Sequence, residues 1–125
     1  MKKTVIAVGS HFAGKSTTIN DYLKPKLGID RKAHIFTLNN QSGFILSQSF
    51  EEANRTVDDV INKYSSYDLL VLSARPAHEN PSLLEEAKVK LAKAGYRVSE
   101  VLIEKNTDNN YYDGKTDEIL KHLNN

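Results

Sequence analysis

Short runs of apolar residues alternate along the chain with segments of helical periodicity. The apolar runs cover residues 4–8, 33–38, 68–73 and 96–104, and inside them apolar residues follow one another directly, as at 69–72. Continuous apolar runs are typical of strands that are covered on both faces, as in parallel sheets built from βαβ units. The pattern therefore predicts a central parallel sheet with helices packed on each side.

Two helices are predicted in the first half of the chain. One begins near Gly14, and Pro25 is expected to kink or end it because proline lacks a backbone donor. A second helix is predicted at residues 50–64, since Ser49 followed three residues later by Glu52 fits a capping box. Apolar residues of this segment recur at helical spacing, so one face of the helix is expected to pack on the sheet.

Two further helices are predicted in the second half. Asn80 is placed to cap a helix that starts at Pro81 and ends before Gly95, a favourable left-handed terminator. A short helix at residues 116–123 carries acidic residues in its first turn and basic residues in its last, which complements the helix dipole. The pattern leaves open whether the tyrosine pair at 111–112 forms a fifth strand.

Composition narrows the class of protein. A length of 125 residues suits a single domain spanning 1–125. The 17 basic and 16 acidic side chains give a net charge of +1, which argues against nucleic-acid binding. The absence of cysteine excludes disulfides, thiolate metal sites and cysteine nucleophiles. The apolar run at 5–8 is too short for a signal peptide or a membrane span. These features predict a cytoplasmic protein with no membrane association.

One motif carries recognisable chemistry. The match to G-x-x-x-x-G-K-[ST] lies between the first predicted strand and the first predicted helix, and consists of Gly9, Ser10, His11, Phe12, Ala13, Gly14, Lys15 and Ser16. Glycines at this spacing let successive backbone N–H groups turn inward and form an anion nest at a helix N-terminus. The motif resembles the Walker A loop of the P-loop nucleoside triphosphatase superfamily. It is alternatively a tight turn with an exposed lysine.

The resemblance implies a fold and a set of roles. With the apolar pattern it implies a three-layer α/β/α sandwich with a four- or five-stranded, mainly parallel sheet. Lys15 would contact the β- and γ-phosphates of ATP or GTP, Ser16 would ligate Mg²⁺, and Thr17 would approach the α-phosphate. Phe12 is bulky for a place beside a nucleotide, so it is expected either to pack on a neighbouring segment or to shape the substrate side.

The second apolar strand departs from the superfamily pattern. It ends in Ser73 where the family carries the acid that holds the magnesium shell, and Asp68 lies at the opposite end of the strand. Glu79, in the loop that follows this strand, could approach the magnesium shell in place of the missing acid. Arg75 is placed where it could stabilise charge on a transferring phosphoryl group as a second catalytic residue beside Lys15, or it is a solvated arginine after a strand.

The sequence contains only weak signals for the residues that would bind the base or an acceptor. Asn106 and Asp108 keep part of the spacing of a guanine-binding motif, with a polar turn as the alternative. The chain also looks like a small nucleotide or metabolite kinase without its arginine-bearing lid. An acceptor would then contact Asn39, Asn40, Gln41, Ser42 and the apolar stretch at 43–46, unless these residues form a loop that leads into a short strand.

Three functions follow from these features. The first is Mg²⁺-dependent binding of a nucleoside triphosphate, ATP ahead of GTP, with phosphoryl transfer to a small-molecule acceptor. The second is a regulatory protein that binds nucleotide with little or no turnover and signals to a protein partner. The third is binding of a phosphate-bearing cofactor or metabolite through the same loop. Whether the chain is an enzyme, a kinase or triphosphatase, is not decided by the sequence.

Overall fold

Five strands form one mixed sheet in the computed structural model, which describes residues 2–125. The strands are β1 (Lys2–Val8), β2 (Ile35–Leu38), β3 (Gln41–Ile45), β4 (Leu69–Ala74) and β5 (Tyr96–Leu102). Their order across the sheet is β2-β3-β4-β1-β5. All neighbouring pairs are parallel except the antiparallel pair of β2 and β3. The carboxyl ends of β3, β4, β1 and β5 therefore meet at one edge of the sheet.

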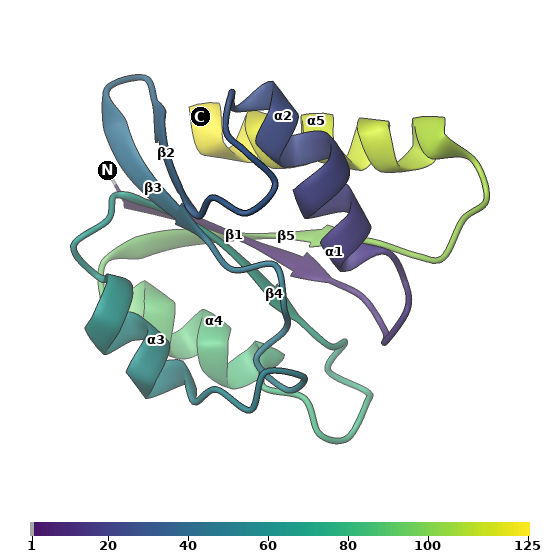
Figure 1. Ribbon diagram of the computed structural model, residues 1–125. Helices are drawn as coiled ribbons and strands as arrows, with labels where there is room; N and C mark the ends of the chain where they lie inside the picture. Colours follow the sequence, from purple (N-terminus) through teal and green to yellow (C-terminus); the bar gives the residue numbers. More distant parts are fainter. Residues whose placement is uncertain (1) are drawn as a thin grey trace.

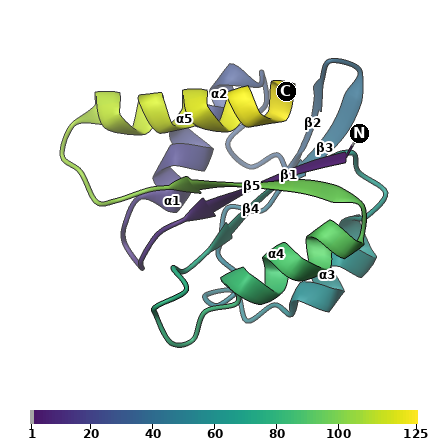
Figure 2. The ribbon, with the colours of Figure 1, turned by 180° about the vertical axis from the view of Figure 1, so that it is seen from behind.

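Helices cover both faces of this sheet (Figures 1 and 2). One layer holds α5 (Asn109–Asn124) and a continuous helical segment made of α1 (Lys15–Thr17), the π-helical η1 (Thr18–Leu23) and α2 (Lys24–Lys26). The other layer holds α3 (Val57–Tyr64) and α4 (Leu84–Lys93). The expected three-layer α/β arrangement is thus present, with a five-stranded, mostly parallel sheet. Within residues 2–125, no helix has the length and apolar character needed to cross a membrane.

The central strands are buried on both faces, as their continuous apolar runs predicted. Val5 and Val71 belong to the core under α5 and η1, whereas Ile6 and Leu72 belong to the core under α3 and α4. All four side chains are almost completely shielded from solvent. Neighbouring residues of one strand therefore stabilise opposite layers, and their burial drives both layers onto the sheet.

The segment that follows β2 forms a hairpin. Asn39 and Asn40 adopt positive φ angles of 52° and 64°, which suit a tight turn. Gly43 is required in β3, because a Cβ atom there would lie 2.2 Å from Cζ of Phe36 on β2. The turn lies at the amino edge of the parallel strands, opposite the loop after β1. Residues 39–42 are thus too far from that loop to contact an acceptor, and the alternative of a short strand is confirmed.

The predicted helix at 50–64 begins later than expected. Ser49 does accept a hydrogen bond from the backbone N–H of Glu52, at 3.2 Å, but the turn it starts ends at Asn54, whose φ is 54°. The helix α3 then begins after Thr56, whose hydroxyl accepts the Asp59 N–H at 3.1 Å. The capping signal was read correctly, but it stabilises an isolated turn because the chain reverses before a helix can form.

The last two helices also differ from prediction at their starts. Helix α4 begins at Leu84 and not at Pro81, since the Ser82 hydroxyl accepts the Leu84 N–H at 3.3 Å and Asn80 caps nothing. Helix α5 begins at Asn109, capped by the Asp108 carboxylate, and is about two turns longer than residues 116–123. The tyrosine pair at 111–112 is consequently helical and forms no strand.

Candidate functional site

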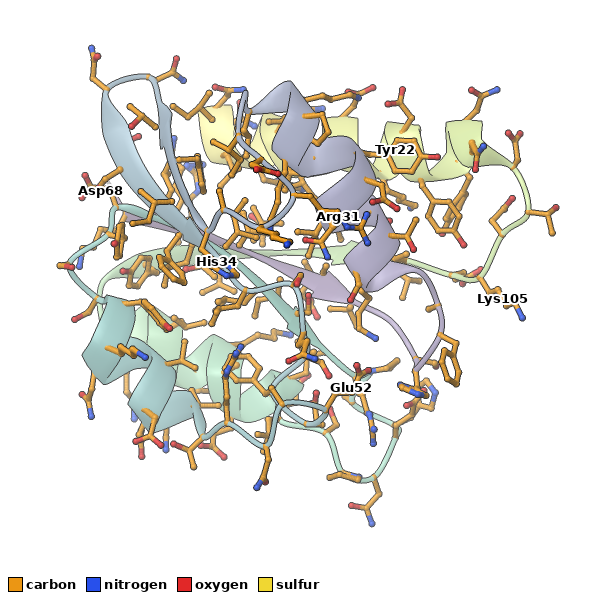
Figure 3. The ribbon with its side chains drawn as sticks, in the orientation of Figure 1. Tyr22, Arg31, His34, Glu52, Asp68 and Lys105 are labelled. Atoms are coloured by element: carbon orange, nitrogen blue, oxygen red, sulfur yellow. The ribbon has the colours of Figure 1, made fainter. Side chains whose placement is uncertain are left out.

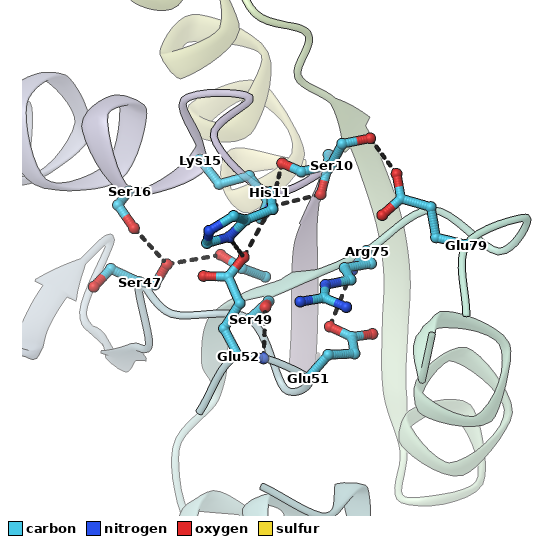
Figure 4. Close-up of polar contacts among 12 residues, drawn as sticks. Ser10, His11, Lys15, Ser16, Ser47, Ser49, Glu51, Glu52, Arg75 and Glu79 are labelled. Atoms are coloured by element: carbon cyan, nitrogen blue, oxygen red, sulfur yellow. Dashed lines mark hydrogen bonds and ion pairs between the residues drawn. The ribbon is translucent and has the colours of Figure 1, made fainter. Parts of the chain in front are cut away.

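The loop that joins β1 to α1 lies at the carboxyl edge of the sheet, between the ends of two other strands (Figure 4). The Gly9 N–H donates to the Ala74 carbonyl at 3.1 Å, and the Ile103 N–H donates to the Val8 carbonyl at 2.7 Å. These bonds tie the start of the loop to the chain beyond β4 and β5. In open α/β sheets this edge is where ligands bind.

Both glycines of the motif are required by the space around them. Gly14 has a φ of 103°, and a Cβ atom there would lie 2.5 Å from Cε1 of Tyr112 on α5. A Cβ atom at Gly9 would lie 2.6 Å from the carbonyl oxygen of Ile103. The Tyr112 hydroxyl also accepts the Asn106 N–H at 2.8 Å, so the ring that closes over Gly14 is itself held in place. The loop conformation therefore depends on α5.

Lys15 points back into the loop and is buried there. Its side chain is only 4% exposed, and its ammonium group donates to the carbonyl oxygens of Gly9 and, at 2.9 Å, Ser10. Burial lowers the pKa of Lys15, while the nearby carboxylates of Glu52, Glu51 and Glu79 act in the opposite direction. A buried ammonium group of this kind favours an anionic partner.

Glu52 supplies that partner in this structure, although it was not among the site residues predicted from the sequence. Its Oε1 atom lies 3.2 Å from Nδ1 of His11 and 3.7 Å from Nζ of Lys15. Burial alone would raise the pKa of Glu52, but the hydrogen bond from His11 and the charge of Lys15 outweigh it and leave the pKa lowered. The position of Glu52 could not be predicted from the sequence, because the strand β3 that precedes it was only one of two alternatives for that segment.

Three serines converge beside Lys15. The hydroxyls of Ser16 and Ser73 both donate to the carbonyl oxygen of Ser47, each at 3.3 Å (Figure 4). Ser73 and Ser16 therefore share one acceptor, although they come from different elements of the fold. Asp68 lies at the other end of β4, where its carbonyl accepts the Lys3 N–H at 2.8 Å.

The hydroxyl oxygens of Ser16 and Ser73 and the carbonyl oxygen of Ser47 suit a hard cation whose other ligands are water or substrate oxygens. Magnesium prefers oxygen donors, keeps several waters and is commonly held by few protein groups together with substrate phosphates. Residues 2–125 contain no group of three or more histidine or acidic side chains that could hold a metal ion. Ser16 could hold Mg²⁺ here only in combination with phosphate oxygens and water.

Arg75 and Glu79, which follow β4, have separate partners. The Ser10 hydroxyl donates to the Glu79 carboxylate, so Glu79 does approach the loop, although at Ser10 and not at the serine cluster. The backbone N–H of Arg75 donates to Glu51 at 3.1 Å. The Arg75 guanidinium has its Nε atom buried with no hydrogen-bond partner among the described residues.

Two hollows flank the loop. The smaller, about 300 Å³, is bounded by loop residues 11–17, Thr17 among them, and by Glu52. The larger, about 710 Å³, lies on the β5 side and has walls that include Phe12, Pro76 and Leu102. Phe12 is 80% exposed, has a φ of 64° and borders both hollows, so it is not buried against a neighbouring segment.

Asn106 and Asp108 form a polar turn. The Asn106 side-chain oxygen accepts the Asp108 N–H at 2.8 Å, and the Asp108 carboxylate accepts the Asn110 N–H at 2.9 Å. Both side chains therefore act as local caps before α5. Neither borders the two hollows among the described residues.

No protein-family model, curated protein or solved structure matches this chain. What the protein binds is therefore inferred from the loop and its surroundings. The structure brings Gly9, Gly14, Lys15 and Ser16 together as the motif predicted, and it adds Glu52 and the carbonyl of Ser47.

Proposed function

We propose that this chain is a P-loop domain that binds ATP with Mg²⁺ and transfers the terminal phosphoryl group to a small-molecule acceptor. The observation that carries the proposal is the Lys15 ammonium group. It is buried inside a loop at the start of a helical segment and is paired there with the Glu52 carboxylate. An anion thus already occupies the hollow in which the resemblance would place phosphate.

Binding of a triphosphate would exchange one anion for another. A phosphate that enters the 300 Å³ hollow meets Lys15 and the backbone N–H groups of the loop, and it displaces Glu52 from both Lys15 and His11. Phosphate offers more charge and more acceptor oxygens than a carboxylate, so the exchange favours the ligand. Thr17, at the same hollow, lies where it could contact the α-phosphate.

Mg²⁺ would neutralise part of the phosphate charge when it is bound. Ser16 would hold it, and the Ser47 carbonyl and the Ser73 hydroxyl are the neighbouring oxygen groups. The carboxylate of Glu52 stands at the same hollow and provides the negative charge that Ser73 lacks.

The larger hollow is where the base of the nucleotide would pack. Its walls include the apolar side chains of Phe12, Pro76 and Leu102, on which any base can pack. Guanine recognition through Asn106 and Asp108 would require groups that are already engaged in the turn before α5. We therefore place the nucleoside end on the β5 side of the loop.

Phosphoryl transfer would depend on positioning and charge. Lys15 would stabilise the charge that develops on the transferring group, which is the main contribution a protein makes to this reaction. Arg75 is the second candidate, because its guanidinium has an unsatisfied Nε atom at the same edge of the sheet. To assist, it would have to rotate toward the smaller hollow, which it does not border in this structure.

Thermal unfolding with ATP, GTP, ADP or no nucleotide, each with and without Mg²⁺, tests the binding step. A ligand at one hundred times its Kd adds about 2.7 kcal/mol, which raises the midpoint by several degrees. We expect Mg·ATP to stabilise the protein but not its Lys15→Ala variant. Lys93→Ala, which removes an exposed lysine of α4, is the matched control and should respond like the parent. Equal shifts with ADP and ATP would favour a phosphate-bearing cofactor, and no shift in any case would overturn the proposal.

A nucleotide-binding regulator without turnover is the second candidate. It is favoured by Ser73, a neutral hydroxyl at the place where the superfamily carries an acid. Measuring the formation of ADP from ATP distinguishes the two functions. A kinase consumes ATP once its acceptor is supplied, whereas a regulator holds the nucleotide unchanged and transmits its presence to a protein partner through the loops.

A further inference from the structure

A third hollow adjoins the phosphate site and is shared with it at Ser16. Its volume is about 350 Å³, and it lies between the helical segment that follows the loop and the chain between β3 and α3. The polar side chains on its walls come from Ser16, Asn20, His34, Gln48 and Arg55. No acidic side chain borders it among the described residues.

Arg55 gives this hollow a cation without a counter-ion. Its side chain is half-buried beside the start of α3, and it forms no ion pair or side-chain hydrogen bond within residues 2–125. Its backbone is fixed, because the Arg55 N–H donates to the Phe50 carbonyl at 2.9 Å. Its planar guanidinium presents donors that match a carboxylate or phosphate group.

His34, which lies where the chain enters β2 (Figure 3), adds an oriented ring to the lining of this hollow. Its Nδ1 atom lies 3.0 Å from the Ile45 carbonyl oxygen, which can only accept, so Nδ1 carries the proton of this bond. The ring also stacks on Phe44, with centroids 5.6 Å apart and planes at 15°. The Nε2 atom is the one left for a ligand.

We propose that this hollow binds the phosphoryl acceptor, a small molecule that carries a hydroxyl group and an anionic carboxylate or phosphate group. Arg55 binds the anionic group, His34 offers its Nε2 atom as a hydrogen-bond acceptor, and the hydroxyl lies at the Ser16 end, next to the phosphate site. This inference rests on the proposed function. In the transfer, the hydroxyl oxygen bonds to the γ-phosphorus, the bond from that phosphorus to the bridging oxygen breaks, its electron pair leaves with ADP, and the hydroxyl proton passes to water.

Binding of simple anions tests the site without an identified acceptor. The ¹⁵N-labelled protein is titrated with sulfate, as a stand-in for phosphate, and separately with malonate, as a carboxylate, at constant ionic strength. We expect the Arg55 Nε–H resonance to shift and saturate with the anion class that the site prefers. Arg55→Gln should weaken this binding at least tenfold, and His34→Gln should weaken it less. Arg97→Gln, on the far edge strand β5, is the charge-matched control and should bind like the parent.

Lys15→Ala separates this site from the phosphate loop. Anion binding that persists in Lys15→Ala and is lost in Arg55→Gln supports the proposal, whereas the reverse pattern or an unsaturated shift overturns it. If Arg55→Gln does not fold, Arg55→Lys keeps the charge and should still bind more weakly than the parent. Nucleotide binding without anion binding at Arg55 refutes this inference alone. Anion binding at Arg55 without nucleotide binding refutes its assignment as an acceptor site together with the proposed function.

Discussion

The Glu52 carboxylate lies 3.7 Å from the Lys15 ammonium group, inside the hollow where we propose that phosphate binds. The two residues are 37 positions apart in the sequence, and they meet because β1 and β3 flank β4 and end at the same edge of the sheet. The pair therefore links the loop after β1 to the turn after β3. Its consequences for ligand binding and for stability can be measured separately.

Removing the charge of Glu52 should tighten binding of phosphate ligands without magnesium. In Glu52→Gln, pyrophosphate no longer competes with a carboxylate for Lys15 and His11, so we expect its Kd to fall about tenfold, or about 1.4 kcal/mol. Calorimetric titration in the presence of a chelator measures this. Glu118→Gln, an exposed acid on α5, serves as the control and should leave the Kd unchanged. A Kd that rises in Glu52→Gln would contradict the competition.

The same pair makes stability depend on pH in the acid range. The pKa of Glu52 is lower in the folded protein than its ordinary value of 4.5, so its ionised form stabilises the fold. This contribution is fully present above pH 4.5 and is lost as the pH falls through the folded pKa. We expect the difference in unfolding free energy between the parent and Glu52→Gln to shrink from pH 5 downward in denaturant titrations. A constant difference would show that the carboxylate is not stabilised by its neighbours.

Replacement of Gly14 should be costly for two separable reasons. Gly14→Ala places a Cβ atom against the Tyr112 ring and also strains a backbone with a φ of 103°. Gly28→Ala is matched in strain, with a φ of 74°, but its Cβ atom would meet nothing within 4 Å. We expect a loss of about 1 kcal/mol for Gly28→Ala and about 3 kcal/mol for Gly14→Ala in chemical unfolding. Equal losses would mean that the contact with Tyr112 relaxes easily.

An acid at position 73 should make nucleotide binding more dependent on magnesium. Ser73 is buried and its hydroxyl shares the Ser47 carbonyl with Ser16, so Ser73→Asp introduces a buried carboxylate next to the proposed ion site. We expect a lower unfolding midpoint without ligand, because an unpaired buried charge is unfavourable, and a larger rise on addition of Mg·ATP than in the parent. Ser73→Asn is the control, since it adds similar volume without charge. A larger rise in Ser73→Asn than in Ser73→Asp would indicate that the ion does not bind there.

Strands and turns that depend on long-range pairing were harder to predict from the sequence than those with strong local signals. The apolar runs of β1 and β4 and the strand-to-helix loop between β1 and α1 were predicted correctly because their patterns are local. Strand β3 begins with polar Gln41 and contains Gly43, so it lacks a strand signal of its own and forms because β2 and β4 provide hydrogen-bond partners on both sides. The position of the turn that follows β3 could not be predicted from the sequence for the same reason.

The amino-acid sequence by itself determined the class of fold, the two-sided burial of the central strands and the position of the loop between β1 and α1, because apolar periodicity and glycine spacing act within a few residues. Only the tertiary structure decided that Glu52 meets Lys15, that Ser16 and Ser73 share one carbonyl, and that Arg55 and His34 border the same hollow. These contacts join segments separated by 21 or more positions, and strand order alone brings such segments together.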